Sequence, residues 1–196
     1  MQNVFIDRDG VILKNIFYDD TGEFEGPRCS KDIEFKSYSI EALKILQKFS
    51  NIFLISNQPN ASKEKTKIKY IYETNLKFEK ILRQNNIFFE SFNYSYHHPK
   101  GKNFIEELNC NECFGYKVYC HCRKPSNFFL KKILNSGKYQ NKYNWFIGDR
   151  ETDIECGLSI KASTILISNK KNNKTKARYI VKNLYDSLNL IIKNIL

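Results

Sequence analysis

The chain has 196 residues, of which 41% are hydrophobic and 27% are charged, and it carries a net charge of +11. This length suits one domain with a full α/β core, and the composition is that of a soluble globular protein. No apolar run approaches the roughly 20 residues of a membrane span, and no signal segment precedes the first apolar run. We therefore expect a cytoplasmic protein without a membrane partner. Lysine and asparagine are abundant throughout, so we interpret the positive charge as a solvated surface; attraction of nucleic acid is the alternative.

The first apolar run, Val4-Phe5-Ile6, predicts a buried strand. Asp7 and Asp9 follow it, and an extended backbone sends both carboxylates to the same side. Two such charges repel each other unless a cation lies between them, and Mg²⁺ is an oxygen-preferring ion that usually arrives with phosphate. The pattern therefore predicts a magnesium and phosphate site. The alternative is a solvated turn at Asp9-Gly10.

Residues 11–38 contain turn signals and predict an irregular flap over the end of this strand, where Tyr18 and Arg28 could meet a substrate. A helix is expected over 39–49. The apolar run that follows predicts a buried parallel strand with a polar end, Ser56-Asn57-Gln58-Pro59. Because α/β proteins place ligands at such ends, Ser56 is expected to hold a phosphoryl oxygen; a plain helix cap is the alternative.

Further elements follow from the same patterns. We expect helices over 61–85, 125–134 and 184–196, strands over 87–94, 143–147 and 163–168, and an exposed basic loop over 169–174.

Four cysteines lie close together in the segment 95–122, namely Cys110, Cys113, Cys120 and Cys122. A Cys-x-x-Cys pair followed by Cys-x-Cys can supply four thiolates for a closed tetrahedral zinc site. A redox pair is the competing interpretation, but such a pair normally opens a helix next to a strand. We therefore predict structural zinc here, and we expect Cys29 and Cys156 to be small packed residues.

Two more charged positions adjoin predicted strands or loops. Lys124 follows the cysteine cluster, and Pro125 suits the first position of the next helix, so Lys124 is expected to be held rigidly. An ordinary surface lysine is the alternative. Asp149 ends the strand 143–147 and can reach a metal, whereas Asp153, one helical turn later, would be a second partner or a cap.

Taken in order, Asp7-Arg8-Asp9-Gly10, Ser56-Asn57-Gln58-Pro59, Cys120-His121-Cys122-Arg123-Lys124-Pro125 and Gly148-Asp149-Arg150 resemble the haloacid dehalogenase (HAD) superfamily of phosphotransferases. The resemblance covers nearly the whole chain and is narrowest to the heptose-bisphosphate and histidinol-phosphate phosphatase branch of subfamily IIIA. It implies one domain over 1–196 with a three-layer, Rossmann-like α/β fold. That fold has a central parallel sheet, a minimal cap and a zinc-binding loop at about 95–122.

The resemblance also implies residue roles. Asp7 would be the nucleophile that forms an aspartyl-phosphate, and Asp9 would be the acid and base. The Asp7 carboxylate, the Asp9 carbonyl and Asp149 would bind Mg²⁺. Ser56 and Lys124 would bind the transferring phosphoryl group.

The resemblance further implies substrate contacts from Asn57, Gln58, Arg123 and Arg150. The two arginines suit an anionic substrate, because a planar guanidinium matches phosphate. Two departures from the family pattern matter. The first zinc cysteine of the family is replaced by Ser95, so the zinc ligands are either the four cysteines, which we favour, or three thiolates plus His97. An arginine commonly used near the substrate is absent, and Lys63 is the candidate substitute.

The function expected from this resemblance is a Mg²⁺-dependent phosphomonoesterase for a small sugar phosphate. The leading substrate is D-glycero-D-manno-heptose 1,7-bisphosphate, dephosphorylated at position 7 for surface polysaccharide synthesis. Histidinol-phosphate phosphatase and polynucleotide 3′-phosphatase are the alternatives. We expect Mg²⁺ and structural Zn²⁺ as cofactors, a monomer, and no nucleic-acid partner.

Overall fold

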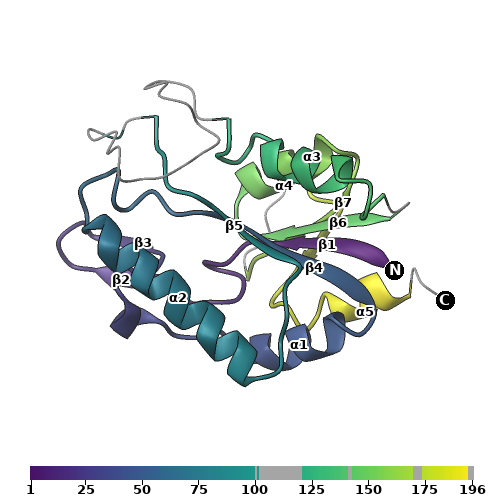
Figure 1. Cartoon of the computed structure of the whole chain (residues 1–196), viewed down its shortest axis with the longest axis horizontal. Coiled ribbons are helices and arrows are strands. Elements are labelled where there is room, and N and C mark those ends of the chain that lie inside the picture. Colours follow the sequence, from purple (N-terminus) through teal and green to yellow (C-terminus); the bar gives the residue numbers. More distant parts are fainter. Residues whose placement is uncertain (100, 102–120, 141–142, 170–173, 194–196) are drawn as a thin grey trace.

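The computed structural model describes residues 1–99, 101, 121–140, 143–169 and 174–193. A fully parallel sheet runs through the molecule in the strand order β5-β4-β1-β6-β7-β8 (Figure 1). Its strands are β1 (Gln2–Ile6), β4 (Ser50–Asn57), β5 (Ser91–Ser95), β6 (Asn144–Gly148), β7 (Ser163–Ile167) and β8 (Tyr179–Val181). The predicted Rossmann-like α/β fold with a central parallel sheet is confirmed.

Helices cover both faces of the sheet, as Figure 1 shows. The helices are α1 (Ser39–Leu46), α2 (Ile68–Gln84), α3 (Phe128–Asn135), α4 (Glu151–Leu158) and α5 (Leu188–Ile192), with a short 3-10 turn, η1 (Ser30–Asp32). Apolar side chains of α1, α2 and α5 pack with Val4 and Ile6 of β1, whereas α3 and α4 pack against Phe5 on the opposite face. This alternation explains the continuous apolar runs in β1, β4, β6 and β7, because these inner strands are buried on both faces.

Aromatic stacking links the three central strands. The ring of Phe5 lies 5.2 Å from that of Phe53 and 6.4 Å from that of Phe146, measured between centroids. Because β4 and β6 both pair with β1 in the parallel direction, the carboxyl ends of these three strands meet at one edge of the sheet, where open α/β sheets bind ligands.

Helix α2 begins at Ile68 rather than at residue 61. Residues 58–67 instead form turns in which the Lys63 and Lys65 amides donate to the carbonyls of Pro59 and Asn60. The Ser62 hydroxyl also bonds the Pro59 carbonyl, and this competition with helical hydrogen bonding explains the later start.

Other boundaries differ as well. Helix α3 begins at Phe128, three residues after Pro125, because the chain makes a turn through 121–125 first. Helix α5 covers only Leu188–Ile192 of the expected 184–196, and residues 194–196 lie outside the described part. Strand β5 starts at Ser91 rather than at 87, and β8 was not predicted because it is a short, half-exposed strand. Most of the basic loop, 170–173, also lies outside the described residues.

The flap expected over 11–38 is partly regular, because β2 (Ile16–Tyr18) and β3 (Glu23–Glu25) form an antiparallel hairpin. Gly22 closes its turn with a φ of 65°, and its amide donates to the Tyr18 carbonyl at 2.8 Å. A glycine is suited to this backbone conformation because it has no Cβ.

The two cysteines outside the cluster are part of the folded body. Cys156 is fully buried and donates to the Ser126 carbonyl at 3.2 Å, so its predicted packing role is confirmed, and Cys29 is half-buried. In the described part of the chain, none of the helices combines the length and the apolar character needed to cross a bilayer.

Candidate active site

A polar cavity of about 270 Å³ lies at the carboxyl ends of the central strands. Asp7 and Asp9 line it directly after β1. Lys124, from the loop before α3, and Asp153, from α4, line it as well. The end of the β2–β3 hairpin and the turns after β4 form the remaining wall. The sequence-predicted strand ends therefore do converge on one site.

Lys124 is the centre of the charge arrangement. Its Nζ lies 2.7 Å from Asp7 Oδ1 and 2.7 Å from Asp153 Oδ1, and it donates to the Ile55 carbonyl at 2.7 Å. Burial lowers the pKa of Lys124, but the carboxylates of Asp153 and Asp7 raise it more, so the net pKa lies above its usual value. The lysine is therefore a charged, buried group rather than an ordinary surface residue.

Asn57 holds the backbone of Lys124 in place. Its Oδ1 accepts from the Lys124 amide at 3.1 Å, and its Nδ2 donates to the Lys124 carbonyl at 3.3 Å. The rigid placement of Lys124 thus comes from this double hydrogen bond to the end of β4, and not from a helix that starts at Pro125.

Three carboxylates gather beside the lysine. Asp7, Asp149 and Asp153 each offer a ligand oxygen, and these oxygens all lie within 4.8 Å of one another. Burial raises the pKa of Asp7 to about 8 and that of Asp149 to about 6, with further contributions from the neighbouring carboxylates. Within the described residues, Asp149 Oδ1 is buried and accepts no hydrogen bond. Hard oxygen ligands with this excess of negative charge fit Mg²⁺, which would hold the carboxylates in their charged form.

Asp153 has a larger part in the site than the sequence suggested. Its Oδ2 accepts from the amides of Asp149 and Arg150, at 3.2 and 3.0 Å, and so caps the start of α4. Its Oδ1 pairs with Lys124. The predicted capping role is confirmed, and the ion pair to Lys124 was missed; an acidic residue in the first turn of a helix after a strand-end Gly-Asp was the available signal.

Asp9 and Ser56 are linked through neighbours whose part the sequence did not indicate. Asp9 accepts from Arg8 and from Gln58, and Gln58 also donates to the Ser56 hydroxyl at 2.8 Å. Arg8 is fully buried, which is rare for arginine without partners, and its sequence position offered no signal. Gly26 of the flap packs directly on Asp9, because a Cβ there would lie 2.2 Å from Asp9 Oδ2.

Arg123 and Arg150 line the same cavity, at its rim. Arg150 is exposed and its Nε lies 3.9 Å from Asp149 Oδ1, whereas Arg123 is half-buried and donates to the His97 carbonyl at 3.3 Å. Lys63 also faces this space, and burial, together with the charges of Lys65 and Arg123, lowers its pKa. The location of these cations fits contact with an anionic substrate.

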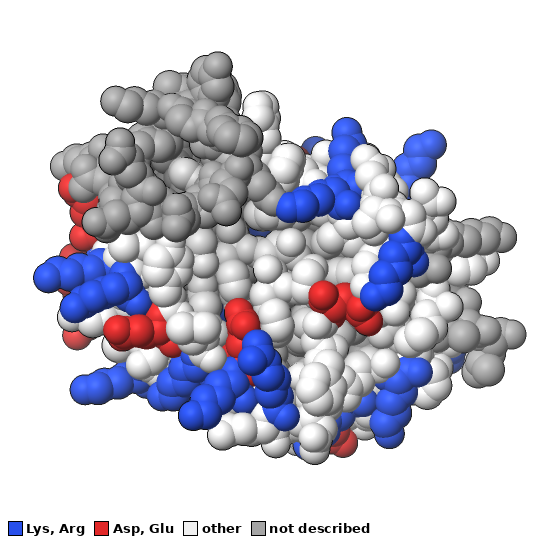
Figure 2. Space-filling view, in the orientation of Figure 1, with Lys and Arg blue, Asp and Glu red and all other residues white. Residues whose placement is uncertain are grey.

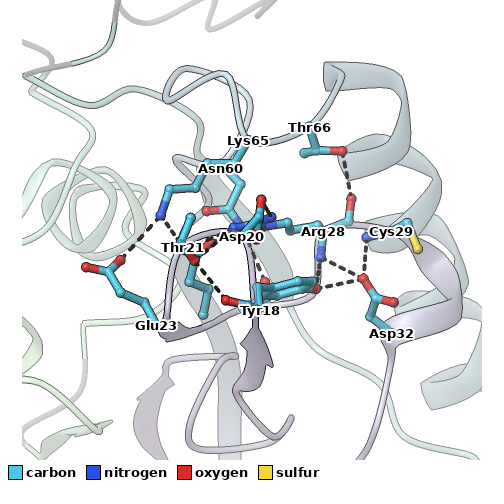
Figure 3. Close-up of polar contacts among 12 residues, drawn as sticks. Tyr18, Asp20, Thr21, Glu23, Arg28, Cys29, Asp32, Asn60, Lys65 and Thr66 are labelled. Atoms are coloured by element: carbon cyan, nitrogen blue, oxygen red, sulfur yellow. Dashed lines mark hydrogen bonds and ion pairs between the residues drawn. The ribbon is translucent and has the colours of Figure 1, made fainter.

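Tyr18 and Arg28 serve the flap itself (Figure 3). The Arg28 guanidinium pairs with Asp20 at 2.6 Å and with Glu25 at 3.2 Å, and it lies 4.0 Å above the Tyr18 ring. Glu25 also pairs with Lys65, so the hairpin is fastened to the turns after β4. Neither Tyr18 nor Arg28 is among the residues that line the cavity, so the structure does not bring them to the site as the sequence suggested.

The zinc prediction falls mostly outside the described residues, because Cys110, Cys113 and Cys120 lie in the segment 102–120. Cys122 is described: it is 2% exposed, and its Sγ lies 3.1 Å from the Ser95 hydroxyl. His97, the alternative zinc ligand, is also buried. Zinc and its ligand set stay a prediction.

The site geometry explains one glycine, and it allows a test. Gly10 has a φ of +81°, and a Cβ there would lie 2.0 Å from Asp149 Oδ2. Gly10→Ala is expected to destabilise the fold and to weaken Mg²⁺ binding, since alanine would be strained and would displace Asp149. Gly137→Ala is the matched control, because Gly137 has the same φ of +81° and no atom within 4 Å of a Cβ.

The two glycine variants separate strain from displacement. In both variants the free energy of unfolding, measured with urea, should fall by about 1 to 3 kcal/mol, because alanine is strained in the αL conformation. Only Gly10→Ala should also lower the affinity for Mg²⁺ in a calorimetric titration. Equal Mg²⁺ affinity in the two variants would show that Asp149 does not need this glycine.

Comparisons with known proteins agree with the geometry. Residues 121–188 match the HAD-hydrolase-like family model, and this matched segment contains Lys124, Asp149 and Asp153. The structure of D,D-heptose 1,7-bisphosphate phosphatase from B. bronchiseptica, complexed with magnesium and phosphate, superposes with a TM-score of 0.74 and 15% identity, over 99% of each chain. The fold is that of the HAD-like hydrolases. The corresponding phosphatase from Burkholderia thailandensis superposes with a TM-score of 0.59 and 14% identity, over 97% of this chain and 99% of that one.

Two kinds of curated relative resemble this chain in sequence. The histidine biosynthesis bifunctional protein HisB of Buchnera aphidicola subsp. Schizaphis graminum is 28% identical over 87% of this chain and 42% of its own length. The D-glycero-alpha-D-manno-heptose-1,7-bisphosphate 7-phosphatase of Photorhabdus laumondii is 25% identical over 78% of this chain and 74% of its own length. The chain thus spans less than half the length of the HisB relatives that it matches.

Proposed function

We propose that this HAD-like chain is a Mg²⁺-dependent phosphomonoesterase that hydrolyses a small sugar phosphate through an aspartyl-phosphate on Asp7. The observation that carries the proposal is the buried ion pair between Lys124 and Asp7, with Asp149 and Asp153 beside it. A nucleophilic carboxylate needs this kind of neighbouring positive charge to approach an anionic phosphoryl group. The family match and the named relatives support the same reaction class.

In the proposed mechanism, a carboxylate oxygen of Asp7 attacks phosphorus, and the bond to the leaving oxygen breaks. Lys124 holds Asp7 Oδ1 at 2.7 Å, so the carboxylate is oriented before the substrate arrives. Lys124 and the Ser56 hydroxyl are assigned to the transferring phosphoryl oxygens. Mg²⁺, held by Asp7, Asp149 and the Asp9 carbonyl, would neutralise the charge gathered there.

Asp9 is assigned to proton transfer. It would donate a proton to the leaving oxygen in the first step, and it would then take a proton from the water that hydrolyses the aspartyl-phosphate. Asp9 lines the cavity two residues after the nucleophile, and this position supports its assignment as acid and base.

The proposed substrate is a heptose 1,7-bisphosphate. Relatives with this named activity support it, and the cations Lys63, Arg123 and Arg150 at the cavity rim suit a second phosphate. Histidinol phosphate is the second candidate, which the likeness to HisB proteins favours. A polynucleotide substrate would need a continuous basic groove. Figure 2 instead shows Lys and Arg side chains in several separate groups on this face of the described residues.

The proposed function is tested by a phosphatase screen with Mg²⁺ over heptose 1,7-bisphosphate, histidinol phosphate and a 3′-phosphorylated oligonucleotide. The heptose bisphosphate should have the highest kcat/KM, and all turnover should stop when Mg²⁺ is chelated. A higher kcat/KM for histidinol phosphate would replace the substrate, whereas no turnover of any of the three would contradict the reaction class. We further propose one domain over 1–196 that acts as a cytoplasmic monomer, to be checked by gel filtration with light scattering.

The proposed zinc site makes a separate prediction. Metal analysis of protein purified without chelator should find about one zinc per chain, and zinc removal should lower thermal stability because a closed thiolate site stabilises its own loop. Cys156→Ser is the control, since this buried cysteine lies outside the cluster and should leave the zinc content unchanged. Zinc well below one per chain in the unaltered protein would contradict the site.

A further inference from the structure

The side chain of Gln58 lies between the two groups assigned to phosphate binding and to proton transfer. It lines the cavity, where the sequence predicts a substrate contact, and it is 2% exposed. Its Nε2 lies 2.7 Å from Asp9 Oδ2 and 2.8 Å from the Ser56 hydroxyl oxygen. Its Oε1 accepts from a terminal nitrogen of Arg8 at 2.5 Å. All the hydrogen bonds that the structure gives this amide are internal.

The chemistry of its partners fixes how this amide is oriented. Arginine can only donate, so the Gln58 oxygen must face Arg8, and the Gln58 nitrogen then faces Asp9. The second N–H of the amide then points to Ser56, whose oxygen accepts it. The hydroxyl hydrogen of Ser56 is therefore left to be donated to another acceptor, such as a phosphoryl oxygen.

Arg8 anchors this arrangement to the body of the protein. It is fully buried, and it donates to Asp9 through Nε at 2.9 Å and through a terminal nitrogen at 3.2 Å. Its other terminal nitrogen donates to the side chain of Asn75 in α2. Because the guanidinium is planar and held on three sides, Asp9 and Gln58 share a fixed frame.

We propose that Gln58 is a positioning residue that couples the Ser56 hydroxyl to the Asp9 carboxylate. One amide group sets the direction in which Ser56 donates and the place where Asp9 meets the leaving oxygen. This inference rests on the proposed phosphatase function, because it concerns the same reacting groups. It replaces the expectation that Gln58 contacts the substrate directly.

The coupling predicts an effect that depends on the leaving group. An alkyl phosphate, such as a sugar phosphate, leaves as an alkoxide and needs the proton from Asp9, whereas p-nitrophenol leaves readily as an anion. Disturbing Asp9 should therefore slow the sugar phosphate much more than p-nitrophenyl phosphate. Disturbing Ser56 should weaken the binding of inorganic phosphate and orthovanadate.

The main variant is Gln58→Glu, which has nearly the same shape and keeps an acceptor for Arg8 but loses both N–H donors. We expect kcat to fall about 100-fold on the sugar phosphate and about tenfold or less on p-nitrophenyl phosphate. The inhibition constant of orthovanadate should rise. Gln58→Asn keeps the amide but shortens the side chain by one methylene. It should change kcat and the orthovanadate inhibition constant in the same directions, by smaller factors.

Two further measurements make the test specific. In a cycle with Ser56→Ala, the orthovanadate effect of Gln58→Asn, which adds no charge, should largely disappear, since the amide is proposed to act on phosphate through that hydroxyl. Gln47→Glu is the matched control: Gln47 lies before the start of β4 and bonds the backbone of Asn86 and Phe88, whereas Ser56 and Gln58 lie at the carboxyl end of that strand. It should keep normal kcat on both substrates.

The outcomes distinguish this inference from the function on which it rests. Equal losses on both substrates, with unchanged orthovanadate inhibition, would overturn the coupling and leave Gln58 a structural residue. Normal activity of Gln58→Glu would overturn it as well. If the unaltered protein hydrolyses neither substrate, the proposed function fails, and it fails without reference to Gln58.

Discussion

Replacing Asp7 with asparagine is expected to lower kcat by at least about three orders of magnitude, because the variant has no oxygen able to form the acyl phosphate bond. Asp7 lines the cavity and its Oδ1 lies 2.7 Å from Lys124 Nζ, so the variant loses the reacting oxygen at the point where this cation holds it. The measurement is steady-state turnover of a sugar phosphate with saturating Mg²⁺.

The fold of Asp7→Asn should be retained, which separates loss of chemistry from loss of structure. Burial raises the pKa of Asp7 to about 8, so a neutral side chain of the same size does not remove a favourable charge from the metal-free protein. Lys124 keeps Asp153 as its partner. The urea midpoint in the absence of Mg²⁺ should therefore stay close to that of the unaltered protein.

A trapping experiment identifies the nucleophile itself. After an acid quench during turnover, intact mass and peptide mapping should find one phosphoryl group on the peptide that contains Asp7. Asp186→Asn, at an exposed aspartate near the C-terminal helix, is the matched control and should leave both turnover and labelling unchanged. Turnover by Asp7→Asn close to that of the unaltered protein, or a label on another peptide, would contradict the assignment.

The metal-binding part of this site could be predicted because it depends on local patterns. Asp7 and Asp149 each follow an apolar run directly, and parallel strands bring their carboxyl ends to one edge of the sheet. The chain therefore needs no long-range information to place these two carboxylates together. The same argument placed Ser56 at the end of β4.

The positioning contacts could not be predicted, since they join residues far apart in the sequence. Arg8 stands between two aspartates after a strand, a place where an arginine is usually solvated, and it is buried because Asn75 and Gln58 offer acceptors in addition to Asp9. The pairing of Lys124 with Asp153 likewise depends on how α3 and α4 pack on the sheet. No periodicity in the chain encodes such contacts.

The hairpin in the flap could not be predicted for a different reason. Its turn residues were recognised, but the hairpin is held by the buried Arg28 and by the Glu25 and Lys65 pair rather than by an apolar face. Pattern analysis searches for alternating apolar residues, and a strand stabilised by charged side chains does not provide them.

Replacing Lys124 with methionine is expected to be the most destabilising single change in the site. Methionine keeps much of the aliphatic stem but leaves Asp7 and Asp153 without the cation that lies 2.7 Å from each. Removing one partner of a buried ion pair costs about 3 to 5 kcal/mol, because the remaining charge is uncompensated. Lys138→Met is the control: the Lys138 side chain is 70% exposed where it pairs with Glu90, and such solvent-exposed pairs contribute little to stability.

The loss in Lys124→Met should grow with pH. Asp7 already has a folded-state pKa near 8 with the lysine present, and removing the positive charge raises that pKa further. The folded variant then binds more protons than the unfolded chain, in which aspartate titrates near pH 4, so its stability falls as pH rises. Urea unfolding at about pH 6 and about pH 9 should show the larger deficit at the higher pH.

Mg²⁺ should recover part of this stability without recovering catalysis. The ion offsets the negative charge of the same carboxylates, so the deficit of Lys124→Met at the higher pH should shrink when Mg²⁺ is added. Turnover should stay at least about 100-fold below that of the unaltered protein, since the donor to the phosphoryl group is missing. A deficit that is independent of both pH and Mg²⁺ would show that Lys124 acts through packing alone, and that the charges of Asp7 and Asp153 are balanced by other groups.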